Sequence, residues 1–146
     1  MDFVFQQSVV VHRTQYELFK FFADAENLNL LTPPWLHFQF LTGFPIDMGV
    51  GVRLAYKIKL HMIPIKWESE ITEWDPPNNF TDVQRKGPYK KWVHSHIFQP
   101  HEQGTTITDR VAYQVLGGRI INWAFVARDL KSIFDYRRIK ILELFP

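Results

Sequence analysis

Apolar and polar residues alternate one by one over much of the chain, and a period of two is typical of strands that bury one face. The clearest case is the segment 50–60, where every second residue is apolar and Arg53, Lys57 and Lys59 lie between them. The same pattern, interrupted by turn residues, predicts seven strands, at 3–12, 36–41, 50–60, 65–75 and 80–86 and in the two arms of a hairpin within 87–113. We therefore predict an antiparallel meander.

After Gly117 and Gly118 the apolar period changes to three and four residues, which is typical of an amphipathic helix. The residues on this stripe are Ile120, Trp123, Ala127, Leu130, Phe134, Arg137 and Ile141. They predict one long helix from Ile120 almost to Phe145. A helix of this kind needs an apolar surface to lie on, and the inner face of the meander is the candidate.

Two short helices are predicted between the first two strands. Thr14 can cap the first, with Glu17 three residues later completing a capping box. The second covers 24–31 and ends before Pro33-Pro34. The predicted fold class is therefore α+β, with a curved seven-stranded antiparallel sheet wrapped around a long C-terminal helix and two short helices after the first strand. We expect residues 1–146 to form a single domain.

The hairpin within 87–113 places polar side chains on an apolar strand face. His94 and His96 lie on the same strand face as Trp92 and Phe98, because side chains two residues apart point to the same side of a strand. If Phe98 pairs with Ile107, antiparallel geometry puts His96 beside Asp109, His94 beside Val111, and Trp92 beside Tyr113. A few polar groups on an apolar wall are typical of a ligand-binding cavity.

The same register argument extends across the meander and collects ionisable groups. Tight turns would pair Tyr56 with Ser69 and Ile71 with Gln84. Five ionisable side chains would then meet at one end of the apolar face: Glu73, Asp82, His94, His96 and Asp109. The full set of expected ligand-binding residues is Leu54, Tyr56, Trp67, Ile71, Glu73, Asp82, Gln84, Trp92, His94, His96, Asp109, Tyr113 and Arg137.

The polar cluster has several interpretations from sequence alone. The first interpretation is a hydrogen-bonded structural network. The second is a binding site for the polar head of an apolar ligand. The third is a catalytic group in which His96 with Asp109, or His94 with Glu73, transfers protons. Metal binding ranks last, because His-x-His spacing alone is common by chance, and no metal or cofactor is predicted. Arg137 either snorkels to water or pairs with a cavity carboxylate.

The predicted proximity of His96 and Asp109 affects the expected pKa of His96. An ionised aspartate favours the charged imidazolium, whereas burial opposes it. We expect the pair to dominate and to raise the pKa of His96, because a half-open pocket weakens desolvation.

Composition narrows the classes of partner. The sequence has 13 Phe, 5 Trp and 5 Tyr, which suggests a large apolar interior. The absence of cysteine excludes disulfides and leaves a cytoplasmic location as the default. A net charge of +2 with interleaved signs argues against nucleic acid. We expect no signal peptide and no integral membrane segment, and a monomer or a homodimer.

Several segments carry a resemblance to a known superfamily: Leu31-Thr32-Pro33-Pro34-Trp35, Trp67 with Ile71, Trp74-Asp75-Pro76-Pro77, Gly87-Pro88-Tyr89, Trp92 to Phe98, Gly104-Thr105, Asp109 to Tyr113 and Ile133 to Arg137. With the order of elements, they resemble the helix-grip fold of the SRPBCC superfamily, which includes START-related lipid-transfer domains and polyketide cyclases. The chain looks most similar to bacterial ligand-binding SRPBCC proteins. The resemblance implies a deep hydrophobic cavity between sheet and last helix.

The expected function is non-enzymatic binding or carriage of a small hydrophobic molecule, of lipid, polyketide or isoprenoid type. The alternative is a cyclase, dehydratase or hydrolase acting on such a molecule by His-Asp or His-Glu proton transfer. A second alternative is a protein-interaction module that uses residues 31–35 as an exposed patch. One fold hosts many functions, so the resemblance does not choose among them.

Overall fold

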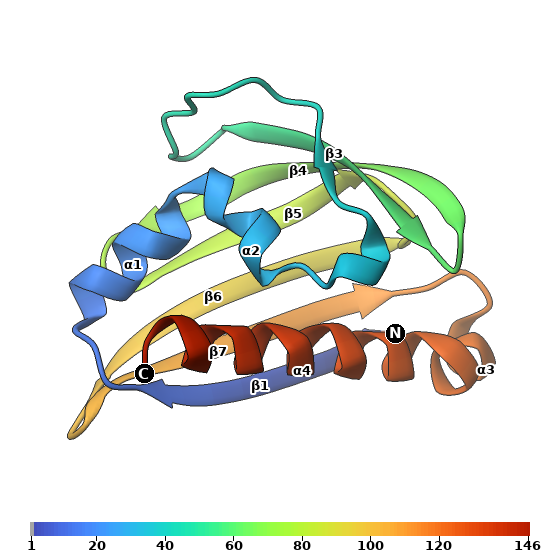
Figure 1. Cartoon of the computed structure of the whole chain (residues 1–146). Coiled ribbons are helices and arrows are strands. Elements are labelled where there is room, and N and C mark those ends of the chain that lie inside the picture. The colour runs from blue at the N-terminus through green and yellow to red at the C-terminus, as the bar shows by residue number, and fades with distance from the viewer. Residues whose placement is uncertain (1) are drawn as a thin grey trace.

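The computed structural model describes residues 2–146 and contains one curved antiparallel sheet of seven strands (Figure 1). The strands are β1 (Phe3–Val11), β2 (Gln39–Phe40), β3 (Arg53–Leu60), β4 (Ile63–Asp75), β5 (Asn79–Lys86), β6 (Lys91–His101) and β7 (Gly104–Gln114). Their order is β1-β7-β6-β5-β4-β3-β2, so the first strand joins the last and the others follow in sequence. The predicted meander is confirmed.

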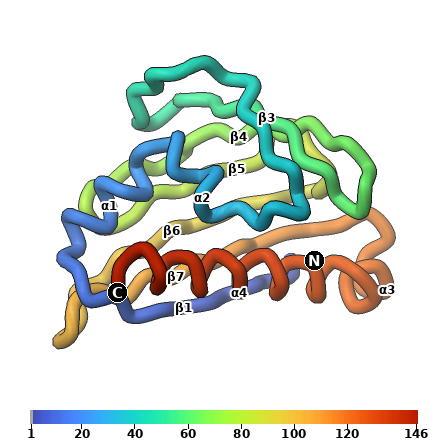
Figure 2. The backbone as a smooth tube through the Cα atoms, viewed as in Figure 1, coloured from blue at the N-terminus to red at the C-terminus, as the bar shows by residue number. Residues whose placement is uncertain are grey.

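The C-terminal helix runs along β1 and β7 on the inner side of the sheet, as the backbone trace in Figure 2 shows. It is continuous from Gly118 to Leu144 but contains one wider π turn. Its parts are α3 (Gly118–Ile121), η3 (Asn122–Val126) and α4 (Ala127–Leu144). Together with the sheet it forms the α+β architecture that the sequence predicts.

Short helical segments cross from β1 to the far edge of the sheet and close one end of the space above it (Figure 1). They are α1 (Gln15–Ala23), η1 (Ala25–Asn27), α2 (Leu28–Leu31) and η2 (Pro34–Leu36). Thr14 caps α1, since its hydroxyl oxygen accepts a hydrogen bond from the Glu17 amide. Phe19 and Phe22 of α1 pack on Phe98 of β6 and so attach this layer to the sheet.

The register of the central hairpin agrees with the prediction. Phe98 lies opposite Ile107, His96 opposite Asp109, and Trp92 opposite Tyr113. On the other side of β6, His94 lies opposite Asp82. These pairings place the two histidines between an aspartate on each neighbouring strand.

The predicted register of β3, β4 and β5 is wrong by about two residues. Tyr56 lies opposite Trp67 and not Ser69, because the β3–β4 turn contains only His61 and Met62, both with positive φ. Ile71 lies opposite Asp82 and not Gln84.

A second irregularity moves the end of β4. The register shifts between Ile71 and Glu73, as in a β-bulge. Glu73 therefore becomes exposed and does not join the polar cluster, which corrects the prediction for this residue.

The predicted apolar stripe of the last helix is only partly buried. Leu130, Phe134, Arg137 and Ile141 are buried, whereas Ile120 is 77% exposed and Trp123 is 83% exposed. The π turn at Asn122–Val126 holds one residue more than an α-turn, so Ile120 before it and Trp123 within it fall out of phase with the stripe. Ala127, directly after the turn, is also exposed.

Two predicted strands are shorter than the pattern indicated. The strand expected at 36–41 is reduced to Gln39–Phe40, because η2 occupies Pro34–Leu36. The strand expected from residue 50 begins at Arg53. Within residues 2–146, none of the helices combines the length and the apolar character that crossing a lipid bilayer requires.

Candidate functional site

A cavity of about 190 Å³ lies between the sheet, α4 and the short helical segments, and most of its lining is apolar. Nine of the predicted ligand-binding residues line it: Leu54, Tyr56, Trp67, Ile71, Asp82, Trp92, His94, His96 and Arg137. The alternation of β3 to β6 was a sufficient signal for eight of these positions, since each points to the inner face of the sheet, and Arg137 lies on the buried stripe of α4.

Four other predicted residues lie outside this lining. Glu73 is exposed after the bulge. The Gln84 side chain forms hydrogen bonds with the backbone of Tyr89, and the Tyr113 hydroxyl donates to the side chain of Asn122. Asp109 is buried behind the two histidines.

The sequence argument missed other lining residues, most of them outside the central strands. Those from the segment between β1 and β3 or from α4 are Phe22, Leu28, Leu31, Leu36, Phe38, Met48, Leu130, Ile133 and Phe134, whereas Ile58 and Leu60 belong to β3 and Tyr89 to the β5–β6 turn. The sequence did contain an indication for the residues between β1 and β3, because the apolar helical segment before Pro33-Pro34 needs an apolar surface to pack on.

The polar part of the site is built around a stacked pair of histidines. His94 and His96 leave the same face of β6, and their ring centroids lie 3.7 Å apart. Phe80 stacks on His96 with centroids 4.1 Å apart, and Phe134 of α4 lies edge-on to His94. The aromatic neighbours fix the ring planes, so the ring nitrogens face the aspartates of β5 and β7.

On the β7 side, the carboxylate of Asp109 is enclosed by donors. His94 Nε2 lies 2.8 Å from Asp109 Oδ1, and Arg137 Nε donates to Asp109 Oδ2 at 3.1 Å. Arg137 itself is only 6% exposed and lies over the ring of Phe22. The ion-pair interpretation of Arg137 is therefore confirmed, and the snorkelling interpretation is wrong.

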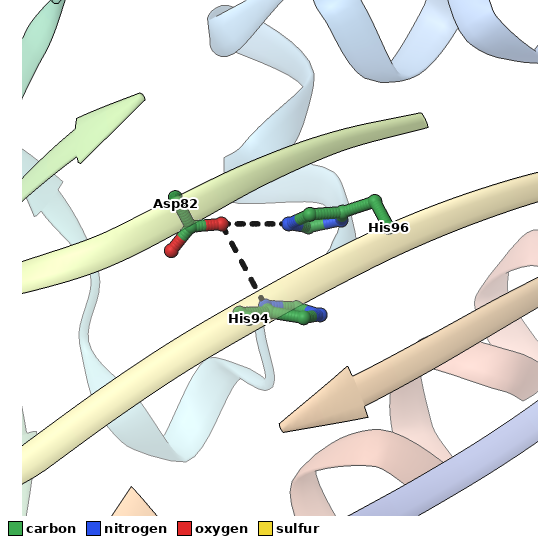
Figure 3. A group of neighbouring side chains, drawn as sticks. All are labelled: Asp82, His94 and His96. Carbon is green, nitrogen blue, oxygen red and sulfur yellow. Dashed lines mark hydrogen bonds and ion pairs between the residues drawn. The ribbon is translucent and has the colours of Figure 1, made fainter. Parts of the chain in front are cut away.

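On the β5 side, the carboxylate of Asp82 lies at the cavity wall. Its Oδ2 is 2.6 Å from His96 Nε2 and 3.8 Å from His94 Nδ1 (Figure 3). His96 and Asp109 lie close together, as expected, but they form no direct hydrogen bond, because His96 Nδ1 and Asp109 Oδ1 are 3.7 Å apart. The hydrogen bonds cross over, so that His96 bonds to Asp82 and His94 to Asp109.

Burial decides the ionisation of His96. Desolvation, together with the nearby charge of His94, lowers the pKa of His96 to about 4, and the hydrogen bond to Asp82 only partly opposes this. The expectation of a raised pKa is therefore wrong. The expectation assumed that a half-open pocket weakens the desolvation of His96, whereas the residue is only 6% exposed.

Both aspartates stay ionised despite burial. Desolvation raises the pKa of Asp109, but the Arg137 charge and the His94 hydrogen bond outweigh it, so that the pKa lies well below its usual range. The pKa of Asp82 is also lowered, since its hydrogen bond with His96 and the neighbouring charges outweigh desolvation.

Aromatic side chains form the part of the cavity wall next to the histidines, where Trp92 lies edge-on to His94. Tyr56 stacks on Trp67, Trp67 meets Trp92 edge-on, and Trp67 Nε1 donates to the Ser69 hydroxyl at 3.0 Å. Burial raises the pKa of the Tyr56 phenol, so this group stays protonated. The wall therefore offers rigid apolar area with few polar groups.

The segment 31–35 is less exposed than an interaction patch would be. Leu31 and Pro33 are buried, and only Pro34 and Trp35 face solvent. Trp35 is 51% exposed and packs edge-on against Tyr136 of α4. This segment holds the helical layer against the last helix.

No protein-family model matches the chain, and no curated protein matches it in sequence. Solved structures do match. A protein of Chromobacterium violaceum is 11% identical with a TM-score of 0.77 over 97% of this chain and 96% of that one. The major latex-like protein 151 of Panax ginseng is 12% identical with a TM-score of 0.73 over 99% and 98%. Ara h 8.0201 is 14% identical with a TM-score of 0.68 over 98% and 99%. The chain has the helix-grip fold that these structures share.

Proposed function

We propose that this protein binds or carries a small hydrophobic molecule with a polar end in the cavity between the sheet and α4. The observation that supports this is the division of the wall: apolar and aromatic side chains cover most of it, and a polar cluster of the half-buried Asp82 with the buried His94, His96 and Arg137 occupies one region. Apolar area supplies affinity, and a few fixed polar groups orient the ligand.

The test is binding of the fluorescent probe 8-anilinonaphthalene-1-sulfonate, with native mass spectrometry for stoichiometry. We expect one probe molecule per chain in the cavity. Leu54→Trp fills the cavity, because Leu54 is buried and lines it, and should weaken binding at least about tenfold. Val4→Trp makes the same kind of change on an exposed strand position and should leave binding unchanged. Equal binding by both variants would contradict the proposal.

A second candidate is an enzyme that transfers protons in the cavity. The observation that favours it is the 2.6 Å hydrogen bond between His96 and Asp82 at the cavity wall. The His94–Glu73 version has no such support, since Glu73 is exposed. A molecule recovered from the protein by native mass spectrometry distinguishes the candidates: a carrier releases it unchanged, whereas an enzyme converts it at a rate that falls in His96→Ala.

A further inference from the structure

Three potential metal-binding atoms converge on one point of the cavity wall (Figure 3). They are Asp82 Oδ2, His94 Nδ1 and His96 Nε2, and all lie within 4.8 Å of one another. Metal–ligand bonds of about 2.0–2.1 Å place neighbouring ligand atoms about 3.3 Å apart in a tetrahedral site. The two measured separations from Asp82 Oδ2, 2.6 Å and 3.8 Å, lie on either side of that value.

The hydrogen bond on the far side of His94 prepares this residue as a ligand. Ionised Asp109 only accepts hydrogen bonds, so His94 Nε2, at 2.8 Å from it, carries a hydrogen atom. The other ring nitrogen, Nδ1, faces the carboxylate of Asp82 at 3.8 Å and is the atom of His94 left to bind a metal.

The arrangement of the cationic side chains leaves the carboxylate of Asp82 open to a metal ion. Arg137 is engaged by Asp109 at 3.1 Å. Among residues 2–146, no lysine or arginine lies within ion-pair distance of Asp82. A buried carboxylate without a cation is costly, and a metal ion supplies the charge.

We propose that Asp82, His94 and His96 bind one divalent transition-metal ion of the zinc or iron(II) class at the cavity wall. Two imidazoles and a carboxylate are a donor set that suits these ions. His96 binds through Nε2, so its ring hydrogen moves to Nδ1, which lies 3.7 Å from Asp109 Oδ1 and 3.4 Å from Arg137 Nη2. Because the guanidinium of Arg137 only donates, its contact with Nδ1 must open when the metal binds.

Asp109 accepts a hydrogen bond from the ligand residue His94, and Arg137 holds Asp109 in place. This is the usual outer-shell arrangement, in which a carboxylate orients a metal-bound imidazole. The His-x-His spacing alone did not indicate a metal site. Together with the third ligand, Asp82 on β5, and the orienting carboxylate, Asp109 on β7, it does.

All three ligand residues line the cavity, so the remaining coordination positions face it. Resting on the proposed function, this gives the chemical class of the ligand's polar end: an oxygen donor such as a carboxylate or an enolate, bound to the metal. An oxygen anion also balances the added positive charge.

The experiment titrates metal-free protein with Zn²⁺ and with Co²⁺ at pH 7.5, and reads metal content by mass spectrometry and the Co²⁺ visible spectrum. We expect one ion per chain. Asp82→Asn, His94→Gln and His96→Asn should each weaken binding at least about 100-fold, the upper end of losses seen for outer-shell changes. His101→Gln is the matched control, as an exposed histidine of the same strand, and should bind as the wild type does. Circular dichroism shows which variants are folded.

Binding that survives in folded Asp82→Asn, or no stoichiometric binding by the wild type, would overturn the metal site. Octanoate tests the ligand class: it should change the Co²⁺ spectrum of the loaded wild type and not of the Leu54→Trp variant. An unchanged spectrum would overturn the oxygen-donor inference. Probe binding by metal-free protein tests the cavity separately, so the failure of one proposal is distinguishable from that of the other.

Discussion

The two carboxylates beside the histidine pair have similar hydrogen bonds and different surroundings. Asp109 on β7 lies behind the pair, 8% exposed at its side chain, and is bonded to Arg137 as well as His94. Asp82 on β5 lies at the cavity wall, 18% exposed, and its partners are the two histidines. One negative charge is balanced inside the protein, and the other faces the space where a ligand would lie.

This difference separates two roles that the sequence could not separate. A buried ion pair closed on all sides holds elements together, here β7 and α4, and breaking it leaves an uncompensated charge. A carboxylate that faces a cavity can still bind a ligand or a metal ion there. The comparison predicts that changes on the Asp109 side damage the fold, whereas changes on the Asp82 side mainly damage binding.

The largest effect is expected from Arg137→Met. The change leaves Asp109 buried without its cation, and loss of one partner of a buried pair costs roughly 3–5 kcal/mol in the free energy of unfolding. Chemical denaturation measures it, and Arg138→Met is the control, since Arg138 is exposed on the next helix position. Adding Asp109→Asn to Arg137→Met should recover part of the loss. A loss below about 1 kcal/mol would show that this side is not structural.

The next effect is a loss of stability on acidification. His96 has a folded pKa of about 4 and an unfolded pKa near ~6.5, so the unfolded chain binds more protons between these values. The stabilisation is present above ~6.5 and is lost as the pH falls to about 4, by an amount on the order of 3 kcal/mol. The lowered pKa values of Asp82 and Asp109 extend the loss below their unfolded values.

Denaturation of metal-free protein between pH 7.5 and 4, with a chelator present, measures this dependence. His96→Asn should flatten the curve between pH 6.5 and 4. The control His12→Asn removes an exposed histidine and should retain the wild-type slope. Wild-type stability that rises on acidification would mean that the pair with Asp82 outweighs desolvation.

A small effect on stability is expected from Asp82→Asn. The amide oxygen still accepts from His96, and Asp82 makes no direct ion pair with an arginine or lysine of the described residues. We expect the free energy of unfolding of metal-free protein to fall by about 1 kcal/mol or less, whereas Asp109→Asn should cost at least about 2 kcal/mol. Equal losses in the two variants would remove the distinction between the sides.

The sequence predicted the register of the β6–β7 hairpin, where both strands alternate regularly. The β6–β7 register follows from alternation and one tight tip, so the facing of His96 and Asp109 was accessible from Phe98 and Ile107. Register alone does not determine hydrogen bonds. The rings of His94 and His96 stack and tilt toward opposite neighbours, and this depends on Phe80 and Phe134.

Irregular backbone explains most of the remaining errors. The bulge beside Glu73 and the π turn at Asn122–Val126 each add a residue, and no apolar period shows such an insertion. Glu73 was therefore placed inside and Trp123 on the buried stripe, although both are exposed. The desolvation of His96 depends on side chains from distant segments, which a local pattern does not report.

The smallest effect is expected from Asp129→Asn, which removes the same chemistry at the surface. His61 Nε2 lies 2.8 Å from Asp129 Oδ2 and joins the β3–β4 turn to α4, but the side chains are 66% and 25% exposed. Water screens exposed ion pairs, which typically contribute about 0.2–1 kcal/mol. We expect the free energy of unfolding to fall by about 0.5 kcal/mol or less, with a salt dependence that the Arg137→Met variant does not share. If Asp129→Asn lowered the free energy of unfolding as much as Arg137→Met does, burial would not explain the difference between the buried Arg137–Asp109 pair and this surface pair.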